Sequence, residues 1–456
     1  MLRRSYSLAG AVIGAAAAAL VAGAPALACS ASNGRPIASF GGGDGSINVP
    51  WYTAGVGQGG TFLGQPLVHL DVTPAGQPGV GSFRTLSLAL SNGSTGDDTG
   101  DLVIRGYRSD GTPDPGYAQG RALVLRTWTT TGIYDSWAGA GADGQRRLVV
   151  AKRREDLMEV PTLLLRRITA AGAVDASFAP PSGARITSPG TSSEFTVDLG
   201  FAVRSSGWVW GCGWSQQTPG TVRLTEIDPQ GRIHAQRAVA LPVGVGQSVT
   251  SACRAVGAAT DGSALISVDR KAGDVSTPAL LKITRAGAVD TAFGTDGYAS
   301  WDGAGAERIV TAPDGSYLVG AHAQTGAGTH LNQVVHVLAG GALDPGWGTG
   351  GVADVGHTDV ALSALSAGSG GTAYVGLSSS TPSGRPGVLR LAPDGRLDTA
   401  YARCGWLEIP SGGGTPSGPA GLVEVRSGVT LIGMTAPRAT ASAGTVPGSR
   451  VDKRTS

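Results

Sequence analysis

The chain repeats one short unit seven times, and this repeat limits it to a small set of architectures. In six copies a glycine is followed six residues later by an aromatic side chain, and a worn copy, Gly231–Arg237, has lost the aromatic. Successive glycines are separated by 77, 61, 59, 56, 54 and 54 residues. Such a period indicates stacked or radially arranged supersecondary units. The intact copies are Gly34–Phe40, Gly111–Tyr117, Gly172–Phe178, Gly287–Phe293, Gly341–Trp347 and Gly395–Tyr401.

Each repeat also predicts short strands separated by turns. In the cleanest copy, 307–312 and 316–322 are expected strands around the turn Pro313-Asp314-Gly315, and 332–338 is a third. A comparable turn recurs in step with the glycines. Outside the N-terminal segment, no stretch keeps the apolar spacing of a helix without being interrupted by Gly or Pro. Four short strands per repeat predict an all-β protein. The recurring turns are Asp143-Gly144, Ser206-Gly207, Asp261-Gly262, Asp314-Gly315, Gly370-Gly371 and Ser427-Gly428.

Four-stranded units of this kind assemble as propeller blades, because radial closure protects their strand edges. We predict one β-propeller of seven blades over residues 34–435, with six or eight blades left open, and a flexible tail over 436–456. The two ends are expected to share the last blade, with the N-terminus donating its outermost strand. The third strand of that blade is either truncated or supplied by Val446 to Arg454.

Residues 1–28 have the pattern of a secretory signal peptide. Arg3 and Arg4 precede an apolar stretch, and Ala26-Leu27-Ala28 is a small-x-small cleavage site. An uncleaved membrane anchor is the rival interpretation. Cys29 directly after the site also allows lipoprotein anchoring, although Ala26 replaces the bulky aliphatic residue expected there. We therefore predict a secreted, extracellular protein with no membrane span after signal removal.

The charge balance argues against a polyanionic partner. The formal net charge is +2, and removal of the signal with its two arginines leaves 0. A protein without net positive charge lacks the basic surface that attracts the phosphates of nucleic acid, so no nucleic-acid partner is expected.

Four cysteines in a secreted chain predict two disulfides, with three possible pairings. Because they fall in neighbouring repeats, Cys212 and Cys253 are the first predicted pair, and Cys29 with Cys404, at the two ends, is the second. A metal site is the weaker interpretation, since no CxxC or paired-histidine spacing accompanies these cysteines. No metal and no cofactor are predicted.

Two positions within the repeat unit have structural interpretations. The aromatic residues are expected to fill the space between adjacent blades. An aspartate three residues after the glycine is expected to accept backbone N–H bonds and fix the turn, with calcium ligation as the alternative. These aspartates are Asp114, Asp175, Asp290, Asp344 and Asp398.

The unit resembles the delta-60 repeat family. The pattern Gly-x-Leu/Val-Asp-x-x-Phe-Gly-x-x-Gly is matched best by 287–297 and 341–351, whereas the Gly34 unit lacks the acid and the Gly231 unit has His234 in its place. The resemblance covers roughly residues 34–435. It implies a secreted or surface-exposed bacterial β-propeller and no single activity.

Candidate functional residues are few. Trp208, Trp210 and Trp214 alternate onto one strand face, where they predict either packing between blades or an aromatic platform for a sugar or partner. The six histidines show no hydrolase or zinc spacing, although His322 and His336 fall on adjacent expected strands. Acids expected near loop tips could serve glycoside cleavage if they met across a cleft. They are Asp97, Asp98, Glu155, Asp156 and Asp269.

We therefore expect a monomeric extracellular binding module for a glycan or surface protein rather than an enzyme, because no catalytic motif is found. The alternative is a carbohydrate-active enzyme with a site at the propeller axis.

Overall fold

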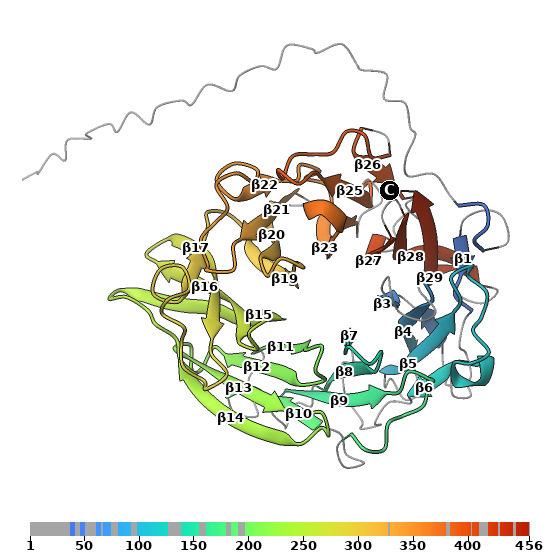
Figure 1. Ribbon diagram of the computed structural model, residues 1–456, viewed down its shortest axis with the longest axis horizontal. Helices are drawn as coiled ribbons and strands as arrows, with labels where there is room; N and C mark the ends of the chain where they lie inside the picture. The colour runs from blue at the N-terminus through green and yellow to red at the C-terminus, as the bar shows by residue number, and fades with distance from the viewer. Residues whose placement is uncertain are drawn as a thin grey trace, which may run out of the picture.

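Seven antiparallel sheets form a ring in the computed structural model (Figure 1). The predicted seven-bladed, all-β propeller is confirmed. Within the described residues the only helical turns are two short 3₁₀ segments, η1 (Ala118–Gly120) and η2 (Ser369–Gly371). The structure describes residues 37–41, 46–50, 61–64, 67–73, 81–92, 98–125, 138–154, 161–178, 184–189, 197–326, 329–379, 384–402, 404–409, 418–426, 429–440 and 444–455.

The first three blades follow one another along the chain. In blade 1 the innermost strand is in two pieces, because β2 and β3 both pair with β4. Blade 1 contains β2 (Thr61–Gly64), β3 (Leu67–Val72), β4 (Phe83–Asn92), β5 (Asp98–Tyr107) and β6 (Leu123–Leu125). Blade 2 contains β7 (Ala138–Ala142), β8 (Leu148–Arg154), β9 (Thr162–Ile168) and β10 (Ala184–Thr187). Blade 3 contains β11 (Val197–Val203), β12 (Val209–Ser215), β13 (Thr221–Ile227) and β14 (Ile233–Ala240).

The next three blades are regular four-stranded meanders. Blade 4 contains β15 (Gln247–Ala258), β16 (Ala264–Ala272), β17 (Val275–Ile283) and β18 (Tyr298–Ser300). Blade 5 contains β19 (Gly305–Thr311), β20 (Tyr317–Gly326), β21 (Thr329–Val337) and β22 (Val352–Asp354). Blade 6 contains β23 (Ala361–Ala367), β24 (Ala373–Ser378), β25 (Gly387–Leu391) and β26 (Trp406–Glu408).

Blade 7 closes the ring by joining the two ends of the chain. It contains β27 (Gly418–Arg426), β28 (Val429–Thr440), β29 (Gly444–Thr455) and β1 (Ser46–Asn48), with Ser46 opposite Asp452 and Asn48 opposite Arg450. The N-terminal segment therefore supplies the outermost strand, as predicted, and the C-terminal segment supplies a full third strand.

The flexible tail expected over 436–456 is wrong for the described residues of that range. Strand β28 continues through Pro437 to Thr440, and 444–455 pair with it along their whole length. The propeller thus extends beyond 435. The physical reason is closure: without this third strand, β28 and β1 would each present an unpaired edge.

Two faces of the ring follow from this meander. The innermost strands contact one another in sequence around the centre, from β3 through β7, β11, β15, β19, β23 and β27 back to β3. Hairpins joining the first and second strands, together with the glycine–aromatic units joining the third and fourth, lie on one face, which we call the turn face. Hairpins joining the second and third strands, and the connections between blades, lie on the opposite face, the loop face.

The glycine–aromatic units link each blade to the next. The aromatic side chains are buried, and Phe293 and Trp347 are each 1% exposed. Phe293 lies directly over Gly341 of the next unit, where an added Cβ would come within 2.8 Å of its ring, and Gly294 N–H donates to Gly340 O at 2.8 Å. The same contact joins Trp347 to Gly395 and Tyr117 to Gly172. The predicted placement of these aromatics between blades is confirmed.

The aspartates of the units fix the turns as predicted. In each case one carboxylate oxygen accepts the N–H of the residue two positions further on, at 2.9–3.2 Å. In four units the second oxygen pairs with a basic side chain on the preceding strand, and these pairs are Asp175 with Arg167, Asp290 with Lys282, Asp344 with His336 and Asp398 with Arg390.

Truncating an interblade aromatic should destabilise the whole ring. We expect Trp347→Ala to lower the free energy of unfolding by about 3–5 kcal/mol, because a large buried side chain is lost and Gly395 is uncovered. Urea unfolding followed by circular dichroism measures this. The control is Val275→Ala at an exposed position, expected to change stability by about 0.5 kcal/mol or less. Equal losses for the two variants would contradict the role of Trp347.

Candidate functional site

The innermost strand of blade 4 is locally distorted. The pairing of β15 with β16 shifts register between Val249 and Ser251 and again between Ala252 and Val256. Cys253 within this bulge has φ +67°, a left-handed conformation that is unusual for a residue other than glycine. Bulges of this kind often redirect a side chain beside a functional site.

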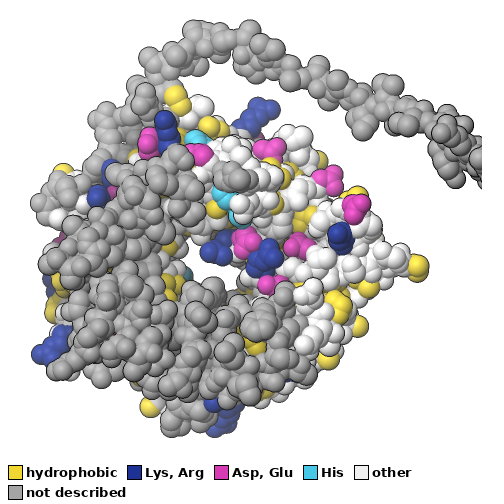
Figure 2. All heavy atoms as spheres, turned by 180° about the vertical axis from the view of Figure 1, so that it is seen from behind, with side chains coloured by type: hydrophobic (Ala, Val, Ile, Leu, Met, Phe, Trp, Pro, Cys, Tyr) yellow, Lys and Arg dark blue, Asp and Glu magenta, His cyan; other side chains and the backbone are white. Residues whose placement is uncertain are grey.

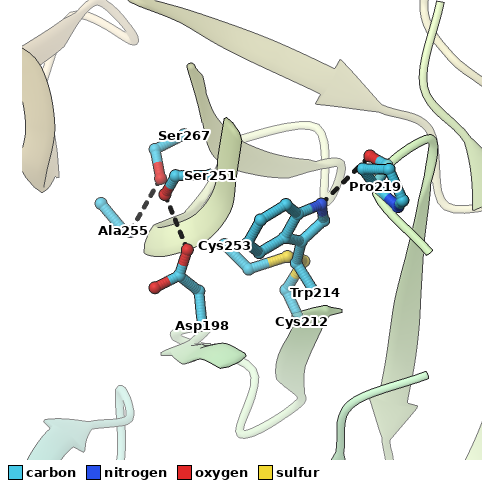
Figure 3. Close-up of a disulfide and its surroundings, with 8 residues drawn as sticks. All are labelled: Asp198, Cys212, Trp214, Pro219, Ser251, Cys253, Ala255 and Ser267. Carbon is cyan, nitrogen blue, oxygen red and sulfur yellow. Dashed lines mark hydrogen bonds between the residues drawn. A yellow bond between two sulfur atoms is a disulfide. The ribbon is translucent and has the colours of Figure 1, made fainter. Parts of the chain in front are cut away.

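A disulfide holds the bulge to the neighbouring blade. Cys253 is bonded to Cys212 of β12, with the Cα atoms 5.5 Å apart, so the first predicted pairing is confirmed. Asp198 Oδ2 accepts a hydrogen bond from Ser251 Oγ at 2.6 Å, and Ser267 Oγ accepts one from Ala255 N–H at 2.9 Å. Figure 3 shows both contacts on one side of the sulfur atoms, with Trp214 on the other. Cys404 carries no free thiol, but Cys29 lies outside the described residues, and their pairing stays a prediction.

Arg254, exposed between two buried neighbours of the bulge, joins a group of charged side chains. Its Nη1 donates to Glu307 Oε1 of β19 at 3.1 Å. Burial opposes the guanidinium charge, but the carboxylates of Glu307, Asp198 and Asp269 outweigh that effect and raise the pKa of Arg254. Arg308, next along β19, donates to the backbone oxygen of Glu307 at 2.8 Å. The group thus combines residues from blades 3, 4 and 5.

Two carboxylates of this group resist ionisation. Burial raises the pKa of Asp269, with Arg254 acting against the shift and Asp198 adding to it. Burial also raises the pKa of Glu307, again against the pull of Arg254. Shifted carboxylates in a cleft are typical of binding and catalytic sites, although structural networks produce them too.

A pair of histidines lies beside these charges. His322 on β20 and His330 on β21 are joined by a hydrogen bond of 2.8 Å between Nε2 of the first and Nδ1 of the second. Burial lowers the pKa of His322, and the nearby His330 and Arg254 lower it further. His322 therefore remains neutral at physiological pH.

The charged group lines a hollow between blades 4 and 5, which we call the interblade cleft. It encloses about 420 Å³. In the space-filling view, charged side chains of both signs gather on one side of the central opening (Figure 2). The cleft lies towards the loop face, because its residues flank the start of β19 and the ends of β16 and β20. They are Arg254, Asp269, Ser276, Pro278, Gly303, Gly305, Glu307, His322, Ala323 and Gln324.

The tryptophans do not form a surface platform. Trp210 and Trp214 are both 0% exposed and pack in the core shared by blades 3 and 4. Their indole N–H groups donate to Gly262 O and Pro219 O, at 3.0 and 3.1 Å. Only Trp208 is partly exposed, with the Arg285 guanidinium 4.6 Å from its ring centre. The packing interpretation therefore holds for Trp210 and Trp214, and the platform is wrong for them.

Sequence reasoning found part of this site. Asp269 and His322 were candidates, and the structure brings them to one cleft, whereas Asp97, Glu155 and Asp156 lie outside the described residues. Arg254 and Glu307 were missed. The available signal was the predicted Cys212–Cys253 disulfide, which brings the residue after Cys253 close to the neighbouring blades. Within the described residues no group of three or more His, Cys, Asp or Glu side chains is arranged to hold a metal.

The comparisons with known proteins show similarity of fold only. No family model and no curated protein matches the chain. Among solved structures, a protein of unknown function from Dyadobacter fermentans is 10% identical with a TM-score of 0.38, covering 90% of this chain and 99% of that one. An ulvan lyase, a polysaccharide lyase, is 7% identical with a TM-score of 0.43, and the match covers 85% of this chain and 94% of the lyase. A Synechocystis apocarotenoid oxygenase variant is 11% identical with a TM-score of 0.35, and the match covers 86% of this chain and 89% of the oxygenase. Similarity this low carries no argument about activity.

Removing the disulfide should loosen the bulge. We expect the double variant Cys212→Ala/Cys253→Ala to lose roughly 2–5 kcal/mol of stability, because the bond closes a loop of 41 residues and holds a strained backbone. Unfolding with and without a reducing agent measures the loss. A reducing agent should destabilise the native protein more than the double variant. Unchanged stability of the double variant would contradict this role.

His322 should make stability depend on pH. Because the folded pKa of His322 lies below its ordinary value of 6.5, the unfolded chain takes up the proton first. The contribution of His322 to the free energy of unfolding is therefore fully present above about pH 6.5 and is lost as the pH falls below that value. We expect His322→Gln to make this fall shallower, though not flat, because the pKa values of His69 and His357 are lowered too. Urea unfolding at a series of pH values measures the slope. The exposed His234→Gln is the control, and an equal slope in both variants would contradict the prediction.

Proposed function

We propose that this protein is a secreted binding module that holds a glycan in the interblade cleft. The observation that carries the proposal is the convergence of Arg254, Asp269, Glu307 and His322 from four strands of two neighbouring blades on one hollow. These side chains offer both donors and acceptors in fixed positions, which is what a hydroxyl-rich ligand requires.

The composition of the cleft favours a sugar over other ligand classes. Six of the ten residues that line it have charged or polar side chains, so an apolar ligand would leave polar groups unpaired. Pro278 and Ala323 add small apolar surfaces that suit the C–H groups of a sugar ring. Because the site is a hollow and not a broad flat patch, it fits a short ligand segment better than the surface of a globular partner.

The expected surroundings agree with an extracellular glycan. The Cys212–Cys253 disulfide indicates an oxidising compartment. No helix among the described residues has the length and hydropathy needed to cross a bilayer. Together with the N-terminal sequence pattern, these features support secretion as part of the proposal.

A second candidate is an extracellular carbohydrate-active enzyme. The observation in its favour is that the pKa values of Asp269 and Glu307 are both raised in one cleft, as general acids require. Binding remains the preferred function, because Glu307 accepts a hydrogen bond from Arg254 and, among the described residues that line the cleft, no hydroxyl or thiol is hydrogen-bonded to a base.

The test is a panel of neutral, acidic and amino-sugar oligosaccharides, with thermal shift and calorimetry for binding and chromatography for products. We expect one class to raise the melting temperature of the native protein without release of products. Glu307→Gln should weaken that binding about tenfold or more, because it breaks the pair that orients Arg254.

The matched control is Glu408→Gln, at an exposed position at the end of β26. It should bind as the native protein does. If no oligosaccharide binds, or if Glu307→Gln binds as tightly as Glu408→Gln, the proposal is wrong. Release of products that Glu307→Gln abolishes would favour the enzyme.

A further inference from the structure

Among the described acids of the charged group, Asp269 is the one whose carboxylate has no hydrogen-bonded partner. Glu307 accepts from Arg254 at 3.1 Å, and Asp198 accepts from Ser251 at 2.6 Å. The Asp269 carboxylate receives no hydrogen bond and no ion pair from the part of the chain that the structure describes. Thr250 Oγ1 donates to its backbone oxygen, at 3.3 Å, and not to the carboxylate.

The backbone opposite Asp269 leaves room for a ligand group. Gly305, the first residue of β19, faces the carboxylate, and a Cβ added there would lie 3.0 Å from Asp269 Oδ2 and 3.1 Å from Oδ1. Any side chain at this position would therefore press on the carboxylate oxygens. Glycine keeps them open to the cleft, whose volume of about 420 Å³ admits a sugar ring.

The charges around the cleft do not balance. On the described strands the group contains the carboxylates of Asp198 (β11), Asp269 (β16) and Glu307 (β19), against the guanidinium groups of Arg254 (β15) and Arg308 (β19). His322 on β20 does not make up the difference, because burial, His330 and Arg254 lower its pKa. These acids therefore outnumber the guanidinium groups by one, and Asp269 is the carboxylate of the group that accepts no hydrogen bond from a described side chain.

We infer that the interblade cleft recognises the protonated primary amine of an amino sugar, with the Asp269 carboxylate as its acceptor and counterion. This inference rests on the proposed function and names its ligand class. The ammonium group donates to Asp269 Oδ1 or Oδ2 beside Gly305, while Arg254 and Glu307 bind ring hydroxyls. An N-acetylated sugar carries no charge and has a bulkier group at that position, so it fits less well.

The experiment compares two tetrasaccharides that differ only at nitrogen, the tetramer of glucosamine and that of N-acetylglucosamine. We expect the native protein to bind the glucosamine tetramer about 10- to 100-fold more tightly, as for a hydrogen bond to a charged group. Added salt should reduce the preference, because the interaction is between charges.

Asp269→Asn should abolish the preference by removing the charge while keeping the shape. Asp274→Asn makes the same change at an exposed position of the β16–β17 hairpin and should leave the preference intact. Melting curves of both variants show whether they fold. If Asp269→Asn fails to fold, Gly305→Ala, which crowds the carboxylate instead of replacing it, should also reduce the preference.

The outcomes separate this inference from the proposed function. Selective binding of the amine that Asp269→Asn loses supports both. Equal binding of the two tetramers, or a preference that survives Asp269→Asn, overturns the inference and leaves glycan binding standing. If neither tetramer nor any other oligosaccharide of the panel binds, the inference and the proposed function are both wrong.

Discussion

The contact between an aromatic side chain of one blade and a glycine of the next holds the ring together. A four-stranded sheet has two apolar faces, and neither is covered within its own blade, so each blade is stable only against its neighbours. The aromatic residue contributes roughly 1.5–3 kcal/mol by burial, and the glycine permits both the close approach and the positive φ. At Gly341, for example, φ is +89° and Phe293 occupies the space that a side chain would need.

The worn repeat shows that this contact tolerates a different chemistry. In the Gly231 unit the aliphatic part of Arg237 lies over Gly287, where other units place a ring. The charges of the turn are also rearranged: Glu226 occupies the position held by Arg167 or Lys282 in other units, and His234 replaces the aspartate. Glu226 is instead paired with Arg285 of the next blade, at 2.8 Å. The interblade link is thus kept by an ion pair across the boundary.

The sequence was informative where structure is local and repeated. The turns, the strands and the closure by the N-terminus all follow from spacing, and the disulfide follows from the adjacency of two repeats. The C-terminal segment was mistaken for a tail because its Ser, Thr, Pro and Ala content resembles that of a linker, whereas its pairing with β28 is decided by the need to close the ring. Composition does not report such a long-range constraint.

The same limit explains the tryptophans and the site. Alternation correctly groups Trp210 and Trp214 on one strand face, but both faces of a blade are buried between neighbours, so alternation does not separate surface from core. The acids and Arg254 come from β11, β15, β16 and β19, which are separated along the chain and are brought together only by the ring. They form no motif in sequence. The position of Arg254 depends on the register shift around Cys253, which the alternation of apolar and polar residues does not predict.

The division of the ring into two faces explains how a repeat protein can carry one distinct site. Both series of repeated turns lie on the turn face, where their geometry must be kept for each blade to contact the next. The loop face is free of that requirement, and in blade 4 the strands that lead to it carry the bulge in β15, the left-handed Cys253 and the unpartnered Asp269. Each of these costs stability, since a strained residue and a partly buried carboxylate without a donor are both unfavourable. A disulfide at the same point offsets part of that cost. Strain and a covalent brace directly beside a cleft that holds an unmatched charge are hard to explain by packing alone, and they are what a preorganised ligand site requires.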